Sequence, residues 1–237
     1  MKITTVLFDL DGTLVPMDQE VFVKDYFSRL VKKMSVYGYA PDKMIEAMWQ
    51  SVRAMIKNNG LATNEDVFWK KFSEILGEGI FEYMPKFDEF YETEFDNVKS
   101  VCGYNPEAAK AVRAIKNMGY RVALATNPLF PRRATELRIS WAGLTPDDFE
   151  FFTTYEDICY CKPNLEYYKE VVKRLGVSPE ECLMVGNDVG EDMITEKLGM
   201  KTFLIPDCII NHADEDISKY QSGSFTDLVK YVENLNC

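Results

Sequence analysis

The stretch FDLDGTL at residues 8–14 follows an apolar run that begins at Ile3. Residues two apart on a β-strand point to the same face, so Asp9 and Asp11 can lie side by side where this strand ends in a glycine-containing turn. Two negative carboxylates this close repel each other. Either a cation lies between them, or one of them keeps its proton. The stretch therefore predicts a hard metal site or a nucleophile beside an acid/base, although alone it equally fits a strand ending in an ordinary Asp-Gly turn.

Size and charge limit the class of protein. The chain has 237 residues, 46% of them hydrophobic, which suits one large domain or a core domain with an insertion. The formal net charge of −11 disfavours nucleic acid and anionic membranes as partners. No apolar run is long enough for a transmembrane helix, and the N-terminal run does not have the pattern of a signal peptide. We therefore expect a cytoplasmic protein that binds neither nucleic acid nor membranes.

The cysteines and the single histidine disfavour several kinds of site. Six cysteines are scattered through a chain without a secretion signal, which predicts reduced thiols. Cys159 and Cys161 lack a second Cys/His pair at zinc spacing. Because His212 is the only histidine, hydrolysis that depends on a histidine base is poorly supported.

Short β-rich runs alternate with helical segments along most of the chain, which predicts an α/β fold with a parallel sheet. The expected strands are residues 3–9, 121–126, 149–153, 182–186 and 201–205. Asn105, followed by proline, predicts the start of one helix, and Ser224 is placed to cap the last one. Another helix is expected after Lys162 and ends at Gly176.

Residues 17–97 break this alternation because they show helical periodicity and no convincing strand. Three apolar helix faces are Phe22/Tyr26/Phe27/Leu30, Ile45/Met48/Trp49/Val52 and Phe68/Trp69/Phe72. The stretch is too long for a loop, so we interpret it as an inserted helical domain whose aromatic residues mostly form its own core. The expected division is a Rossmann-like core of residues 1–16 and 98–237 and a helical cap of residues 17–97.

Polar side chains end several of the predicted strands, and open parallel sheets bind ligands at that edge. Those beyond the first strand are Thr126 and Asn127, Lys162 at a helix start, and Asn187, Asp188 and Asp192 after the strand 182–186. Together with the two aspartates they predict a site for a doubly charged anion and a hard cation. Each of these residues also has an ordinary structural explanation, such as a solvated lysine or acidic residues at a helix start. The occurrence of all of them in this order and spacing along the chain is much harder to explain in that way.

These motifs resemble those of the haloacid dehalogenase superfamily, whose members are mostly phosphatases. The resemblance covers nearly the whole chain: FDLDGTL is similar to the first motif, Thr126 to the second, Lys162 to the third and residues 186–192 to the fourth. It implies a Rossmann-like parallel sheet with an α-helical cap inserted after the first strand, the C1 type of cap.

The resemblance also implies a role for each position. Asp9 attacks phosphorus and forms an aspartyl-phosphate, and Asp11 protonates the leaving group and then serves as base for the hydrolytic water. Thr126 and Lys162 bind the transferring phosphoryl group, and the backbone N–H near Asn127 is a further donor. Mg²⁺ is held by Asp9, by the backbone carbonyl of Asp11 and by the fourth motif. Carboxylate, carbonyl and water ligands favour Mg²⁺ over zinc.

The fourth motif departs from the usual pattern, in which aspartate directly follows the glycine. Asn187 stands at that place, Asp188 follows it, and Asp192 keeps the second acidic position. Either Asn187 offers its amide oxygen to the metal, or a shifted turn brings Asp188 in directly. We prefer Asp188, because an ionised oxygen binds Mg²⁺ more strongly.

The leading hypothesis is a Mg²⁺-dependent phosphatase that hydrolyses a small phosphorylated metabolite. Asp11 favours phosphoryl transfer, because dehalogenases of this superfamily need neither an acid/base at that position nor a metal. A phosphomutase, a phosphonate hydrolase with a cap lysine, a receiver-like phospho-accepting module and a binding protein that has kept the fold remain alternatives. Arg132 and Arg133 after the second motif either meet an anionic substrate or are solvated charges.

Overall fold

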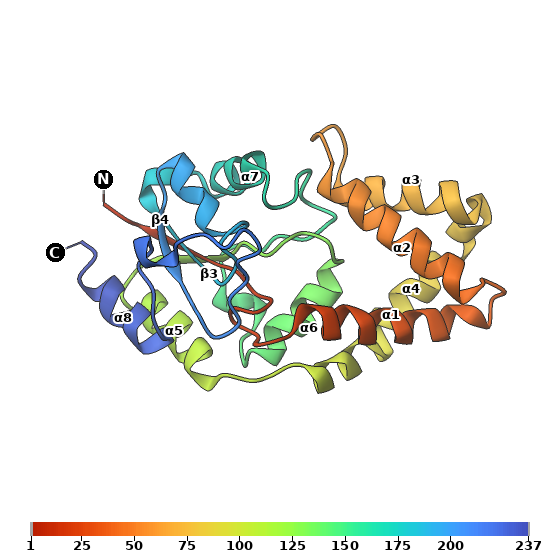
Figure 1. Cartoon of the computed structure of the whole chain (residues 1–237), viewed down its shortest axis with the longest axis horizontal. Helices are drawn as coiled ribbons and strands as arrows, with labels where there is room; N and C mark the ends of the chain where they lie inside the picture. The colour runs from red at the N-terminus through yellow and green to blue at the C-terminus, as the bar shows by residue number, and fades with distance from the viewer. Residues whose placement is uncertain (1, 237) are drawn as a thin grey trace.

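The computed structural model describes residues 2–236 and has two parts (Figure 1). One part is a parallel sheet with helices on both faces. The other is a set of helices, coloured red to yellow, that the chain forms between its first two strands. This arrangement confirms the α/β fold with an inserted helical cap that the sequence predicts.

Within the described residues, four parallel strands form one sheet in the order β2-β1-β3-β4. The strands are β1 Thr5–Phe8, β2 Arg121–Leu124, β3 Cys182–Gly186 and β4 Lys201–Leu204. The helices of this part are α5 Pro106–Asn117, α6 Arg132–Trp141, α7 Leu165–Leu175 and α8 Phe225–Glu233, and its short 3₁₀ turns are η3 Pro146–Asp148, η4 Pro179–Glu181, η5 Met193–Leu198 and η6 Ile217–Lys219. Val6 and Phe8 of β1 pack on the side of α5 and α8, whereas Leu7 packs on the side of α7. Because both faces are covered, the strands are apolar along their length.

The expected strand at residues 149–153 is wrong. Its one β-bridge joins Phe152 to Leu124 at the edge of β2. The segment does run beside β2, since the Leu124 N–H donates to the Phe151 carbonyl at 2.9 Å. At Thr153 the backbone N–H still donates to the Leu124 carbonyl at 3.1 Å, and the hydroxyl donates to the Thr126 carbonyl at 2.6 Å. The other four strands are present: β3 has the expected bounds, whereas β1, β2 and β4 are shorter than expected, so Asp9 and Thr126 lie just beyond the ends of β1 and β2.

The local helix signals are confirmed. The side chains of Asn105 and Ser224 accept hydrogen bonds from backbone N–H groups in the first turns of α5 and α8. Asn164, two residues beyond Lys162, caps α7 in the same way. That helix ends at Gly176, whose φ of 66° is the left-handed conformation that glycine adopts without strain.

The cap comprises α1 Gln19–Ser35, α2 Pro41–Ile56, α3 Asn64–Leu76 and α4 Met84–Thr93, with the 3₁₀ segments η1 Glu78–Tyr83 and η2 Phe95–Val101. The two linkers to the core lie against each other, because Met17 bridges Cys102 and the Gly103 N–H donates to the Pro16 carbonyl at 2.7 Å. One expected core face is only partly buried: Met48 is inside, but Trp49 is 41% exposed. The exposed part of that face borders the cavity described below.

Two expectations from composition concern membranes and thiols. None of the described helices combines the length and apolar character needed to cross a bilayer. The described cysteines, at positions 102, 159, 161, 182 and 208, are all free, and Cys237 lies outside the described residues.

Candidate active site

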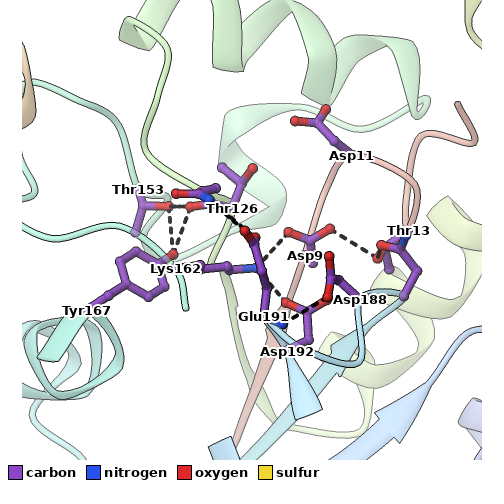
Figure 2. A network of polar contacts seen from close by, with 12 residues as sticks. Asp9, Asp11, Thr13, Thr126, Thr153, Lys162, Tyr167, Asp188, Glu191 and Asp192 are labelled. Carbon is purple, nitrogen blue, oxygen red and sulfur yellow. Dashed lines mark hydrogen bonds and ion pairs between the residues drawn. The ribbon is translucent and has the colours of Figure 1, made fainter. Parts of the chain in front are cut away.

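A buried lysine joins the loop after β1 to the loop after β3 (Figure 2). Lys162 is 1% exposed, and its Nζ lies 2.8 Å from Asp9 Oδ1 and 2.6 Å from Asp192 Oδ1. Burial opposes the charge of this ammonium, but the two carboxylates outweigh burial and hold its pKa well above the usual range. The lysine therefore remains a cation and fixes one oxygen of Asp9.

Thr13 and Asn187 form a second link between the same two loops. The Thr13 hydroxyl lies 3.1 Å from Asp9 Oδ2 and 2.7 Å from Asn187 Oδ1, and its single proton serves one acceptor at a time. The amide nitrogen of Asn187 donates to the Cys208 carbonyl at 2.7 Å. Gly12 has a φ of +87°, and a Cβ there would lie 2.5 Å from Asn187 Nδ2, so the close approach of the loops requires glycine.

Asp11 lies apart from this network, with its carboxylate turned away from that of Asp9 (Figure 2). It forms an ion pair with Arg138 of α6, which is fully buried and also lies over the Phe130 ring, 4.2 Å from its centroid. Burial raises the pKa of Asp11, and the attraction of Arg138 only partly offsets that effect. The other oxygen of Asp11, Oδ1, is buried and has no hydrogen-bond partner.

Sequence reasoning missed Arg138 and considered its neighbours on the same helix instead. Arg132 pairs with Asp157 at 2.7 Å and Arg133 with Glu92 at 3.0 Å, both as partly exposed ion pairs outside the aspartate network. The available signal was the position of Arg138 on the buried face of α6, next to Ile139.

Glu191 is a second residue that the sequence did not single out. Asn127 Nδ2 lies 3.2 Å from each Glu191 carboxylate oxygen, so the side chain of Asn127 contacts this glutamate. Burial raises the pKa of Glu191 to about 8, despite the attraction of Lys162. A glutamate directly before the expected Asp192 was the only signal in the sequence.

Asp188 and Asp192 shape the turn after β3. Asp188 Oδ1 accepts the N–H groups of Gly190 at 2.8 Å and Glu191 at 2.9 Å, and Asp192 Oδ2 accepts the Asp188 N–H at 3.1 Å. A Cβ at Gly186 would clash with the Asp192 carboxylate, which explains the glycine that ends β3. The structure thus brings the expected residues of the fourth motif to the same edge as Asp9 and Thr126, all lining one cavity.

A family model described as haloacid dehalogenase-like hydrolase matches residues 3–195. The chain belongs to this family. It is similar to glyceraldehyde 3-phosphate phosphatase of Methanocaldococcus jannaschii, with 29% identity over 234 residues that cover 97% of each chain. Among solved structures it is similar to a HAD phosphatase from Thermococcus onnurineus (TM-score 0.62, 21% identity, 100% of both chains covered). It is also similar to the HAD-hydrolase YfnB from Bacillus subtilis bound to magnesium (TM-score 0.57, 20% identity, 98% of this chain and 100% of that one).

Acidic side chains outnumber basic ones at this hydrolase site. The carboxylates that line the cavity around Asp9 are those of Asp9, Asp11, Asp188, Glu191 and Asp192. Among the described residues, only Lys162 and Arg138 form ion pairs with members of this group. Burial raises the pKa of Asp192, as it does for Asp11 and Glu191, so ionisation of the whole group is costly. A hard cation among these oxygens would relieve that cost.

A cavity of about 1080 Å³ extends from this cluster into the cap. Asp9, Thr126 and Asn127 lie at its core end, and residues of α1 and α2 form much of the remaining wall. Asp9 therefore borders a space large enough for a substrate, while its Oδ1 is held by Lys162.

Proposed function

We propose that this hydrolase is a Mg²⁺-dependent phosphatase that acts on phosphate monoesters through an aspartyl-phosphate at Asp9. The observation that carries the proposal is the contact of Asp9 Oδ1 with Lys162 at 2.8 Å, at the end of a cavity that Asp11 also lines. The phosphatases of M. jannaschii and T. onnurineus, which share the family and the fold respectively, support it. The substrate expected from the sequence is a small phosphorylated metabolite.

The residues divide the reaction into two displacements. Asp9 Oδ2 forms a bond to phosphorus while the bond from phosphorus to the leaving-group oxygen breaks, and Asp11 transfers its proton to that oxygen. Asp11 then takes a proton from a water molecule whose oxygen attacks the phosphoryl group, which releases inorganic phosphate and restores the Asp9 carboxylate. The raised pKa of Asp11 suits the first step. Its carboxylate must rotate away from Arg138 to take part.

Lys162 and Thr126 act on the phosphoryl oxygens. The Lys162 ammonium already lies within hydrogen-bonding distance of Asp9 and supplies positive charge where negative charge spreads in the transition state. Thr126 is 1% exposed at the core end of the cavity, a place from which its hydroxyl is proposed to donate to the same group. Asn127 follows it and is held by Glu191.

The donor set fits a magnesium ion. The excess of carboxylates around Asp9 is the structural sign of a cation requirement. Asp9, the backbone carbonyl of Asp11 and Asp188 would hold the ion, which when bound would neutralise charge on the transferring phosphoryl group. Asp188 is preferred to Asn187, because both polar atoms of that amide are already engaged. Among residues 2–236 no three His, Cys, Asp or Glu side chains are grouped closely enough to hold a metal by themselves, so water would have to complete the coordination of the ion.

The test is hydrolysis of p-nitrophenyl phosphate with Mg²⁺ and with EDTA, in the wild type and in Asp9→Asn. We expect turnover only with Mg²⁺ and none in the variant. Asp147→Asn, at an exposed aspartate that does not line the cavity, is the matched control and should keep full activity. Undiminished turnover in Asp9→Asn would refute the assignment of the nucleophile. A phosphorylated protein that persists without turnover would instead favour the receiver-like alternative.

A further inference from the structure

The cap presents an apolar helix face that is only partly covered by the described residues. Ile45, Trp49, Val52 and Ile56 follow one another on one side of α2, and all four line the cavity above Asp9. Trp49 and Ile56 are each 41% exposed. Apolar residues at helical spacing normally pack against a neighbour, so this face is suited to contact a bound group.

The opposite sides of the cavity are also apolar and aromatic. Phe27 of α1 packs against Trp49 with 5.0 Å between ring centroids. The core contributes Leu129, Phe130 and Tyr155 to the wall. Both the cap and the core therefore surround the space with apolar surface, and this surface is continuous with the aspartate cluster.

The charges around the cavity disfavour a substrate with a second anionic group. Among the described residues, the only cations that line it are Lys24 and Lys32, and both are exposed side chains of α1. Arg138 is nearby but is already paired with Asp11. A carboxylate or second phosphate on the substrate would lose water and gain no buried cation.

A few polar groups interrupt the apolar wall. The hydroxyl groups of Tyr26 and Tyr91 lie 2.6 Å apart and both residues line the cavity. Asn127 Oδ1 is buried beside it without a hydrogen-bond partner. Such isolated donors and acceptors orient a largely apolar ligand, which is the usual composition of a small-molecule site.

We propose that this cavity binds the leaving group, and that the preferred substrates are phosphate monoesters of bulky, largely apolar alcohols with no second anionic group. The proposal rests on the phosphatase function proposed above and names its substrate class. The cavity of about 1080 Å³ is much larger than a three-carbon leaving group, which would leave most of the apolar wall in contact with water. A bulky apolar group would replace that water, and each buried methylene favours binding by roughly fourfold.

The first test compares kcat/KM for 2-naphthyl phosphate and for glyceraldehyde 3-phosphate with Mg²⁺. We expect the naphthyl ester to be preferred by at least roughly tenfold. Trp49→Ala should lower kcat/KM for the naphthyl ester roughly tenfold, mostly through KM, and should leave the small substrate nearly unchanged. Ile56→Ser, a second exposed position on the same face, should act in the same direction. Leu61→Ala is the control, since Leu61 is 88% exposed, lies outside the cavity lining and should alter neither substrate.

A second measurement does not depend on turnover. Calorimetric titration of 2-naphthyl phosphate into metal-free Asp9→Asn should show binding that Asp9→Asn/Trp49→Ala weakens. Turnover with the opposite preference, or equal effects of Trp49→Ala on both substrates, would overturn the substrate class and leave the phosphatase function standing. No hydrolysis of any phosphate ester with Mg²⁺ would overturn the phosphatase function, and this proposal with it.

Discussion

Removal of the charge of Lys162 should lower both the stability of the folded protein and its activity, for different reasons. The ammonium is 1% exposed and bridges Asp9 at 2.8 Å and Asp192 at 2.6 Å, so Lys162→Met leaves two buried carboxylates without their shared cation. Loss of one partner from a buried ion pair costs about 3–5 kcal/mol. In the variant Asp192, whose pKa burial already raises, loses the attraction of Lys162 that lowers it, so its folded pKa rises further and stability falls as pH rises. The loss should therefore be larger at pH 8 than at pH 5.

Urea denaturation of metal-free protein, followed by circular dichroism, measures this loss. Lys162→Met/Asp192→Asn should recover much of the stability at pH 8 because it removes one of the two unpaired carboxylates, but it should not recover phosphatase activity. Lys110→Met is the control, since its ion pair with Glu107 lies on the surface, where solvent screens the attraction. A Lys162→Met protein as stable as the wild type at pH 8 would refute the proposed electrostatic role.

Three further predictions concern neighbouring residues. Asp11→Asn should slow steady-state turnover about 10²–10⁴-fold, and rapid-quench labelling should still detect the phosphoenzyme; an unchanged rate would contradict the acid/base role. Gly12→Ala should lower the stability by about 1–3 kcal/mol and weaken Mg²⁺ activation, because φ is +87° and the new Cβ meets Asn187; calorimetry should show the lower Tm. Because its folded pKa is raised to about 8, Glu191 contributes stability at low pH that is lost as pH rises toward 8. Glu191→Gln should flatten this decline in urea titrations of metal-free protein, and an unaltered pH profile would show that Glu191 does not titrate there.

The sequence predicted correctly those features of the fold that depend only on residues close together in the chain. Asn105 and Ser224 cap helices because a side-chain oxygen beside the first turn is enough to satisfy an N–H group. The segment 149–153 has the composition of a strand and forms backbone hydrogen bonds with β2, but it makes only one bridge, between Phe152 and Leu124. Composition does not encode how regular the pairing with a neighbouring strand is, so the strand assignment failed there.

The residues that sequence reasoning missed are those defined by tertiary partners. Arg138 is one of several charged residues on α6, and only the folded chain shows that it meets Asp11, 127 positions away. Trp49 has the spacing of a core residue, yet it is 41% exposed and borders the cavity, because Phe27 of α1 covers only part of its ring. Helical periodicity identifies an apolar face but not the molecule that covers it.

The two ends of the cavity are built from different parts of the chain and meet different parts of a substrate. The core end, with Asp9, Lys162 and Thr126, contains the charges that a phosphoryl group requires whatever alcohol it carries. The cap end offers mainly apolar contact, and the two linkers that carry it are paired with each other at Met17 and Cys102. Discrimination between substrates therefore has to come from the leaving group, because the same carboxylates and ammonium face every phosphate ester that enters.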